Sequence, residues 1–340
     1  MIPKLILPLT WTTWSIDPSV LVGVGLAAAG YVVVFRRYRQ FPQRHLRMAS
    51  AFAGLLIMTL ALESPLDYGA DHYFFFMHMT QHMLLTAVGA PLLLVALPAQ
   101  AVADGERRWP WLGLISRIGS RIWIGAFMVN FLVLLWHVPS MYELALLNPG
   151  AHIVSHVCFI AAGMFMWWPV LRPLPDSVQG GKEGFRPLGK MLYLVLASTP
   201  MMMFAYGLAL DSEVLYPFYS HTPHLWGISA AADQHIGGLI MITMDTTVCL
   251  IAIAIWFFSW FEVESYEDDR GHEPGQPAPA ASPPPGGSRT DRQRQAMNPP
   301  ATTVVRWRMD LPDVERAGSR SRREDPTDMA RVGPTGTDAH

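Results

Sequence analysis

The sequence predicts an all-α polytopic membrane protein: a bundle of seven transmembrane helices with an outer N-terminus and a cytoplasmic C-terminus. Of the 340 residues, 51% are hydrophobic and only 15% are charged, whereas soluble domains carry roughly 25% charged residues. Apolar stretches of spanning length recur through the first 261 residues, and basic residues gather in alternate loops. We therefore predict an outer N-terminal segment (1–17), a transmembrane domain (18–261) and a disordered cytoplasmic tail (262–340).

The first three predicted spans are 18–35, 48–62 and 73–97. A spanning helix needs roughly 17 to 25 apolar residues, so the short second stretch is expected to extend through its polar ends. In the first span, Gly23, Gly25 and Gly30 are more typical of close helix packing than of a ligand site. The third span opens with HYFFFMHMTQHMLL (72–85), where three histidines and three methionines interrupt an apolar helix. An imidazole in a bilayer needs a partner or a route to water, so this run indicates a function.

The remaining predicted spans are 121–138, 152–170, 189–210 and 236–260. Tryptophans, whose amphipathic rings favour the membrane interface, lie near the predicted ends of several spans. They are Trp123, Trp136, Trp167, Trp168, Trp226 and Trp260. The last span also carries Asp245, about ten residues and thus about 15 Å from its outer end. An ionisable side chain at that depth is a functional candidate by default.

Basic residues determine the predicted orientation, because Lys and Arg accumulate in short cytoplasmic loops. The first loop, RRYRQFPQRHLR, contains five of them, and the third and fifth loops contain four each. The second, fourth and sixth loops, near 63–72, 139–151 and 211–235, contain none. These even loops and the N-terminus are therefore predicted to lie outside.

Composition excludes several classes of protein. The tail, 262–340, is rich in Pro, Gly, Ser and mixed charge and cannot bury enough apolar surface to fold. The net charge of −2 gives no indication of a nucleic-acid partner, whereas the apolar spans imply contact with membrane lipid. Both cysteines, Cys158 and Cys249, lie in apolar runs and are expected to be free thiols. We find no nucleophilic triad, phosphate-binding loop or HExxH motif, so we expect no enzymatic activity.

Histidines concentrate on the predicted outer side of the membrane domain. Of the ten in that domain, only His45 lies in a cytoplasmic loop. The other nine are His72, His78, His82, His137, His152, His156, His221, His224 and His235. His78 and His82 are four residues apart, so they project from one helix face with about 6 Å between their Cβ atoms and can hold one ion. His152 and His156 repeat this spacing in the fifth span.

Methionines accompany these histidines in the outer half of the domain. Met79 and Met83 lie beside the first histidine pair, and Met201 and Met241 lie near the outer ends of later spans. Imidazole together with thioether suits Cu(I), whereas carboxylate and water ligands suit harder ions. The residues thus predict an outer metal site whose candidates are His78, His82, His137, His152, His156, His235, Met79 and Met83.

Five sequence blocks resemble one known family, the CtaG-type cytochrome c oxidase assembly factors of bacterial membranes. The blocks are HMTQHMLL (78–85), WHVPSMYELAL (136–146), HIVSHVCF with the following WWPV (152–170), YLVLASTPMM (193–202) and ADQHIGGLIM (232–241). The resemblance covers about 45–261 and leaves the tail outside. It implies a seven-helix protein of the bacterial plasma membrane that is needed to assemble an aa-type oxidase, with copper delivery to the oxidase catalytic subunit as the expected role.

The family motifs can be carried over to individual residues of this chain. The resemblance assigns His78, His82, His137, His152 and His156 to the motif, with Gln81, Asp233 and Gln234 beside them. Asp233 joins the predicted metal ligands on this basis, and Gln81 and Gln234 join Asp245 as further functional candidates. His235 stands where many relatives have a second Gln, which weakens the case for His235 as a shared ligand.

Three other interpretations stay open at this stage. Histidines from different helices could ligate haem axially, as in membrane cytochromes. A non-haem iron enzyme is a second alternative, but its histidine boxes would be expected on the cytoplasmic side. The third is a metal-free scaffold for oxidase subunits, in which the histidines only hydrogen-bond one helix to another.

Overall fold

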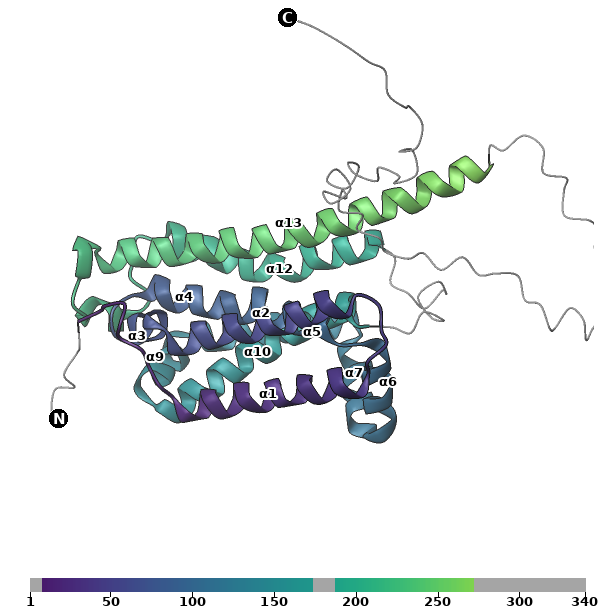
Figure 1. Cartoon of the computed structure of the whole chain (residues 1–340). Helices are drawn as coiled ribbons and strands as arrows, with labels where there is room; N and C mark the ends of the chain where they lie inside the picture. Colours follow the sequence, from purple (N-terminus) through teal and green to yellow (C-terminus); the bar gives the residue numbers. More distant parts are fainter. Residues whose placement is uncertain (1–7, 174–186, 272–340) are drawn as a thin grey trace, which may run out of the picture. The chain divides into compact units, whose positions relative to one another are not determined.

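The computed structural model describes residues 8–173 and 187–271, and every regular element within them is helical (Figure 1). Nearly all of the predicted tail, 272–340, lies outside the described residues. The last helix, α13, runs from Ala230 to Gly271 and so continues past residue 262, where the tail was predicted to begin.

Within the described residues, six helical segments are long and apolar enough to cross a membrane. Five are continuous helices: α1 (Pro18–Arg37), α2 (Arg44–Glu63), α10 (Pro149–Leu171), α12 (Pro187–Leu210) and α13. The sixth is the predicted third span, built from α4 (Phe75–Met83), the π-helix η1 (Leu84–Gly89) and α5 (Ala90–Ala96). The prediction of an all-α polytopic membrane protein is therefore confirmed.

The fourth predicted span has a form that the sequence did not indicate. Its helix α8 (Ile122–His137) has only 16 residues, about 24 Å, which is shorter than the hydrocarbon core. The preceding α7 (Pro110–Gly119) meets α8 at an angle of 87°, because Arg121, between the two helices, has an extended backbone conformation. Counting α7 and α8 as one span raises the number of candidate spans to seven.

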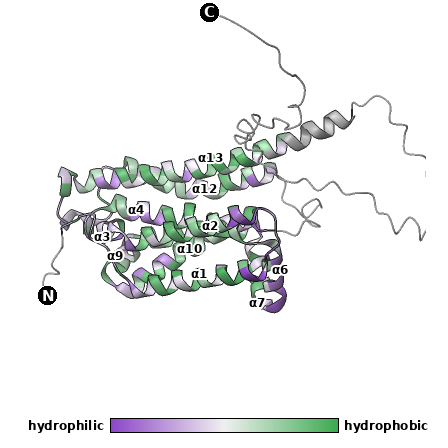
Figure 2. Ribbon diagram, viewed as in Figure 1, coloured by the Kyte–Doolittle hydropathy of each residue, from purple (hydrophilic) through white to green (hydrophobic). Residues whose placement is uncertain are grey.

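The outward surface of the spans is apolar, as expected of a surface in contact with lipid. Figure 2 shows hydrophobic residues along the spans and a hydrophilic concentration on α6 (Ala99–Arg108). Large apolar side chains such as Leu26, Phe52, Phe127 and Ile255 are exposed on different helices. An exposed apolar surface of this extent would aggregate in water, so it indicates membrane lipid as its neighbour.

The third span changes its helical geometry at Leu84, two residues after His82. Pro91 lies in the first turn of α5, where it lacks an N–H and crowds the carbonyl of the residue four positions earlier. The π-helix η1 occupies this stretch, and π-helical turns inside α-helices are frequent at functional sites. The Thr86 hydroxyl donates to the Phe159 carbonyl at 3.3 Å, which ties η1 to α10.

Close helix contacts occur at glycines other than those of the first span. A Cβ added at Gly23, Gly25 or Gly30 would meet nothing within 4 Å, so the expectation that these three mediate close packing was wrong. At Gly238 of α13 it would lie 2.7 Å from the Ala209 backbone nitrogen, and at Gly163 of α10 it would lie 2.6 Å from the Thr86 carbonyl oxygen. These backbone-to-backbone contacts bring the helices around the histidines together.

Three short helices complete the end of the bundle that carries the histidines. They are α3 (Pro65–His72), α9 (Pro139–Leu147) and the 3-10 turn η2 (Pro217–His221). A further 3-10 turn, η3 (Leu225–Gly227), precedes α13. The helix α3 brings acidic side chains next to the histidines, and α9 and η2 bring tyrosine side chains.

Candidate metal centre

Five of the predicted histidines come together between α4, α8 and α10, and we call them the histidine cluster. Its members are His78, His82, His137, His152 and His156. Within each i,i+4 pair the ring centroids are 4.3 Å apart. Across the helices, the His78 ring lies 6.1 Å from His152, and the His82 ring lies 5.9 Å from His156 and 6.1 Å from His137. His82 therefore has three other members of the cluster within about 6 Å.

Several nitrogens of the cluster have no hydrogen-bond partner. Both ring nitrogens of His82 are buried without a partner, as are the Nε2 atoms of His152 and His156. Leaving such groups unpaired typically costs about 1–3 kcal/mol each, so an arrangement with three affected rings needs a reason. In the described parts of the chain no three His, Cys, Asp or Glu side chains already converge in metal-binding geometry. A bound ion would therefore require the imidazoles to turn.

Acidic side chains of α3 border one side of the cluster. Asp71 lies 3.6 Å from the Nδ1 atom of His152, and Asp67 accepts a hydrogen bond from the Gln81 amide at 2.6 Å. Gln81 also donates to the Ala61 carbonyl at 3.0 Å, so this functional candidate links α4 to α2 and α3. Asp67 and Asp71 are not among the site residues predicted from the sequence, although their i,i+4 spacing beside a histidine-rich run was a signal.

Tyrosines of η2 and α9 cover the cluster. The Tyr219 hydroxyl donates a hydrogen bond to the Ala70 carbonyl at 2.9 Å and accepts one from the Tyr142 hydroxyl at 2.9 Å. It also lies 3.5 Å from His78 Nδ1. Burial raises the pKa of the Tyr219 phenol well above its ordinary value, so the hydroxyl remains a neutral donor. Tyr216 donates to the His137 carbonyl at 2.8 Å. These bonds hold the loop before α13 against the cluster.

Three predicted residues at the start of α13 have other partners. The Asp233 carboxylate accepts the backbone N–H groups of Phe75 at 2.7 Å and Phe76 at 2.9 Å. The Gln234 side chain bonds to the backbone of the 213–215 loop in both directions. His235 Nε2 donates to the Asp211 carbonyl at 2.7 Å, in an exposed position. The structure thus uses these residues to hold a loop and to cap α4, and it does not bring His235 into the histidine cluster.

Asp245 belongs to a different buried group. Its carboxylate lies 4.0 Å from the Cys249 sulfur, which lies 3.5 Å from the Ser198 hydroxyl. Asp245 thus neighbours a thiol one turn along α13, and its side chain also bonds to the Ser198 hydroxyl of α12 rather than to a histidine. Cys158 and Cys249 are both free thiols, as expected.

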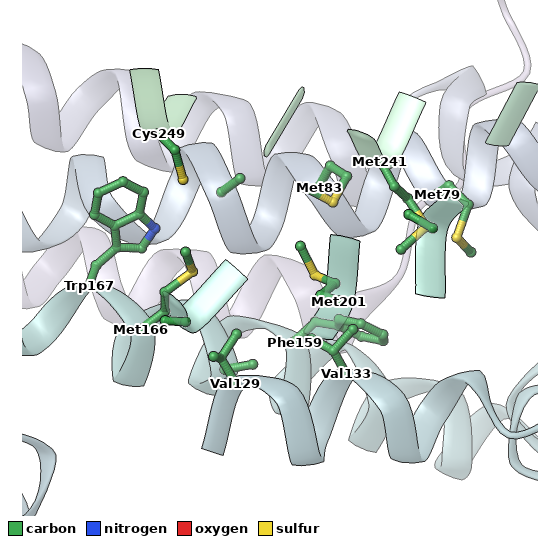
Figure 3. Packing of buried hydrophobic residues seen from close by; sticks show 14 of the residues in the cluster. Met79, Met83, Val129, Val133, Phe159, Met166, Trp167, Met201, Met241 and Cys249 are labelled. Carbon is green, nitrogen blue, oxygen red and sulfur yellow. The ribbon is translucent and has the colours of Figure 1, made fainter. Parts of the chain in front are cut away.

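A small cavity of about 10 Å³ lies next to His82, between α4, α8, α12 and α13. Six of its lining residues carry sulfur or imidazole donors: Met79, Met83, Met201, Met241, His82 and His137. We call it the methionine cavity, and its four methionines lie in one region between the helices in Figure 3. Met79 and Met83 were predicted candidates, whereas Met201 and Met241 could be associated with them only after the helices had packed.

Asp67 is expected to make stability depend on pH. Burial first, and the neighbouring Asp71 charge second, raise the pKa of the Asp67 carboxyl from 3.8 to about 7. Because the folded pKa exceeds the unfolded value, the stabilisation is complete below about pH 4 and is lost as the pH rises through about 7. An Asp67→Asn variant should therefore lose less thermal stability than the wild type between about pH 5 and about pH 8. Identical profiles in a detergent melting assay would contradict this prediction, and Asp211→Asn, at an exposed position, is the control.

Comparisons with known proteins agree with the helical membrane architecture. The family model of the cytochrome c oxidase caa3 assembly factor matches residues 29–262. An uncharacterised protein of Mycobacterium leprae is 24% identical over 274 residues, which cover 74% of this chain and 40% of that protein. Uncharacterised proteins of Mycobacterium bovis and Mycobacterium tuberculosis are each 25% identical over 272 residues, covering 73% of this chain and 39% of theirs. The chain therefore spans about two fifths of the length of these relatives, and no solved structure matches it.

Proposed function

The chain belongs to the cytochrome c oxidase caa3 assembly factor family, and from this premise we propose that it binds copper at the histidine cluster and passes it to an oxidase subunit. The resemblance predicted from five sequence blocks is confirmed by the match over 29–262. Copper is the cargo in this proposal, and the protein has a non-catalytic, chaperone-like role. The client is the catalytic subunit of the oxidase, which lies in the same membrane.

One observation carries the copper proposal: His82 is buried at 5% exposure and neither of its ring nitrogens has a partner. A histidine that served only to join helices would satisfy at least one nitrogen, as His137 does by donating from Nδ1 to the Val133 carbonyl at 2.7 Å. A metal ion bound by turned imidazoles would account for the free nitrogens of His82, His152 and His156 together. Ligand exchange between neighbouring imidazoles would then let the ion leave.

The haem and scaffold alternatives have less support. The cavity beside His82 and His137 has a volume of about 10 Å³, which is room for an ion or a single water and far less than a porphyrin needs. A metal-free scaffold leaves the unpaired imidazole nitrogens without an explanation. The distribution of basic residues favours the outer side of the plasma membrane for the cluster, which suits copper acquired outside the cytoplasm.

The copper content of detergent-purified protein after anaerobic Cu(I) loading tests the proposal. We expect tight copper in the wild type and in His45→Ala, an exposed control in the first turn of α2, and its loss in His78→Ala/His82→Ala. The visible absorption spectrum of the same samples checks the haem alternative, because bound haem gives an intense Soret band and Cu(I) gives none. If wild type and variants all stay free of metal while an aa-type oxidase still requires the protein, the scaffold interpretation replaces this one.

A further inference from the structure

The methionine cavity differs chemically from the rest of the histidine cluster. The remainder of the cluster borders the carboxylates of α3, whereas none of the described residues that line the cavity carries a carboxylate. Its donors are four thioethers and two imidazoles, supplied by α4, α8, α12 and α13. This set suits a soft monovalent ion such as Cu(I) and is a poor set for the harder divalent ions.

The contact between His137 and Met79 indicates where an ion would lie. His137 Nδ1 is 2.7 Å from the Val133 carbonyl oxygen, which can only accept, so Nδ1 carries the proton. In a neutral ring Nε2 then presents a lone pair, and its neighbour is the Met79 sulfur at 3.4 Å, which also presents lone pairs. Two facing lone pairs give no hydrogen bond, and a doubly protonated ring would place a charge at a position only 3% exposed. A soft cation bound by both atoms would use both lone pairs and remove the repulsion between them.

His82 connects this cavity to the rest of the cluster. It lines the cavity, it is one helical turn from His78, and its ring centroid lies 5.9 Å from that of His156. Asp71 and His152 are half-buried, whereas His82 is 5% exposed and Met79 is 0% exposed. The series runs from water-accessible hard ligands to buried soft ligands.

We propose that the methionine cavity is an inner Cu(I) site, filled from the outer part of the histidine cluster through His82. This inference rests on the proposed copper function and specifies which donors hold the ion and in which oxidation state. No electron transfer is involved, because the ion arrives and leaves as Cu(I) while ligands exchange around it. Methionine also fills irregular gaps in cores, but here the His137 Nε2–Met79 sulfur contact lies in a cavity lined by three further thioethers, which is the arrangement that a soft cation would stabilise.

A Met79→Leu/Met241→Leu double variant separates this inference from the general copper proposal. Leucine keeps the volume and apolar character, and such exchanges usually cost less than about 1.5 kcal/mol each, so the variant should fold. The matched control is Met58→Leu/Met166→Leu, since both residues are buried outside the cavity lining. Cu(I) affinity is measured anaerobically by competition with a chromophoric chelator, and Ag(I) serves as an air-stable soft analogue. X-ray absorption at the copper edge reports whether sulfur is bound.

We expect about tenfold or greater loss of Cu(I) and Ag(I) affinity in Met79→Leu/Met241→Leu, together with loss of sulfur scattering, and no change in the control. Unchanged affinity with nitrogen scattering alone in the wild type would overturn the inner site and leave the copper proposal intact. Wild-type protein that binds neither ion would remove the copper proposal and the inner site together. The two failures are therefore distinguishable.

Discussion

A Gly163→Val variant is expected to lose about 3 kcal/mol or more of stability and to fail to accumulate as folded membrane protein. A Cβ at this position would lie 2.6 Å from the Thr86 carbonyl oxygen, 2.7 Å from the Ala90 Cβ and 3.0 Å from the Thr86 Cα. Two of these three atoms are backbone, so no side-chain rotation relieves the overlap. The branched side chain must instead push α10 away from η1, which would also break the bond from Thr86 to the Phe159 carbonyl.

The measurement is size-exclusion profile and melting temperature in detergent, with Gly23→Val as the matched control. Gly23 is also in the interior of a spanning helix, but an added Cβ there would meet nothing within 4 Å. The control should therefore resemble the wild type. Equal behaviour of the two variants would mean that α10 and η1 do not pack as closely as the structure shows.

Replacement of Asp233 by alanine is expected to cost about 2–5 kcal/mol and to remove copper binding, because it frees one buried and one partly buried N–H group at the start of α4. The residue at the N-cap of α4, Phe74, has no side-chain oxygen to offer, and the carboxylate of Asp233 replaces it from α13. Its negative charge also lies at the positive end of the α4 dipole. Loss of this cap would fray the first turn of α4, directly before His78.

The Asp233→Ala prediction is checked by melting temperature and Cu(I) content measured on the same preparation. Asp233→Asn keeps one accepting oxygen without the charge and should give an intermediate result. Glu213→Ala, an exposed change at the same end of the bundle, should have no effect on either quantity. A stable Asp233→Ala protein that lacks copper would instead make Asp233 a ligand, as the family resemblance first implied.

Local regularities of the sequence predicted the parts of the site that lie on one helix. The i,i+4 spacing placed His78 beside His82 and His152 beside His156, because four residues is close to one helical turn. Spacing did not predict the hydrogen-bond partners of Asp233 and His235 on α13. Asp233 bonds to the backbone at the start of α4, and His235 bonds to the Asp211 carbonyl in a loop. Spacing along one helix does not say which neighbour a side chain will meet.

The sequence by itself determined which segments cross the membrane and which orientation we predict for them. Both depend on quantities read along the chain, the apolar length that a bilayer requires and the distribution of basic residues between loops. Only the tertiary structure decided which donors share a site. The methionine cavity combines Met79 with Met201 and Met241, which are more than a hundred residues away in the sequence. The helices that carry these residues pack through side-chain contacts and through close backbone contacts at glycines such as Gly238. Contacts of that kind depend on shape in three dimensions, and hydrophobicity along the chain does not encode them.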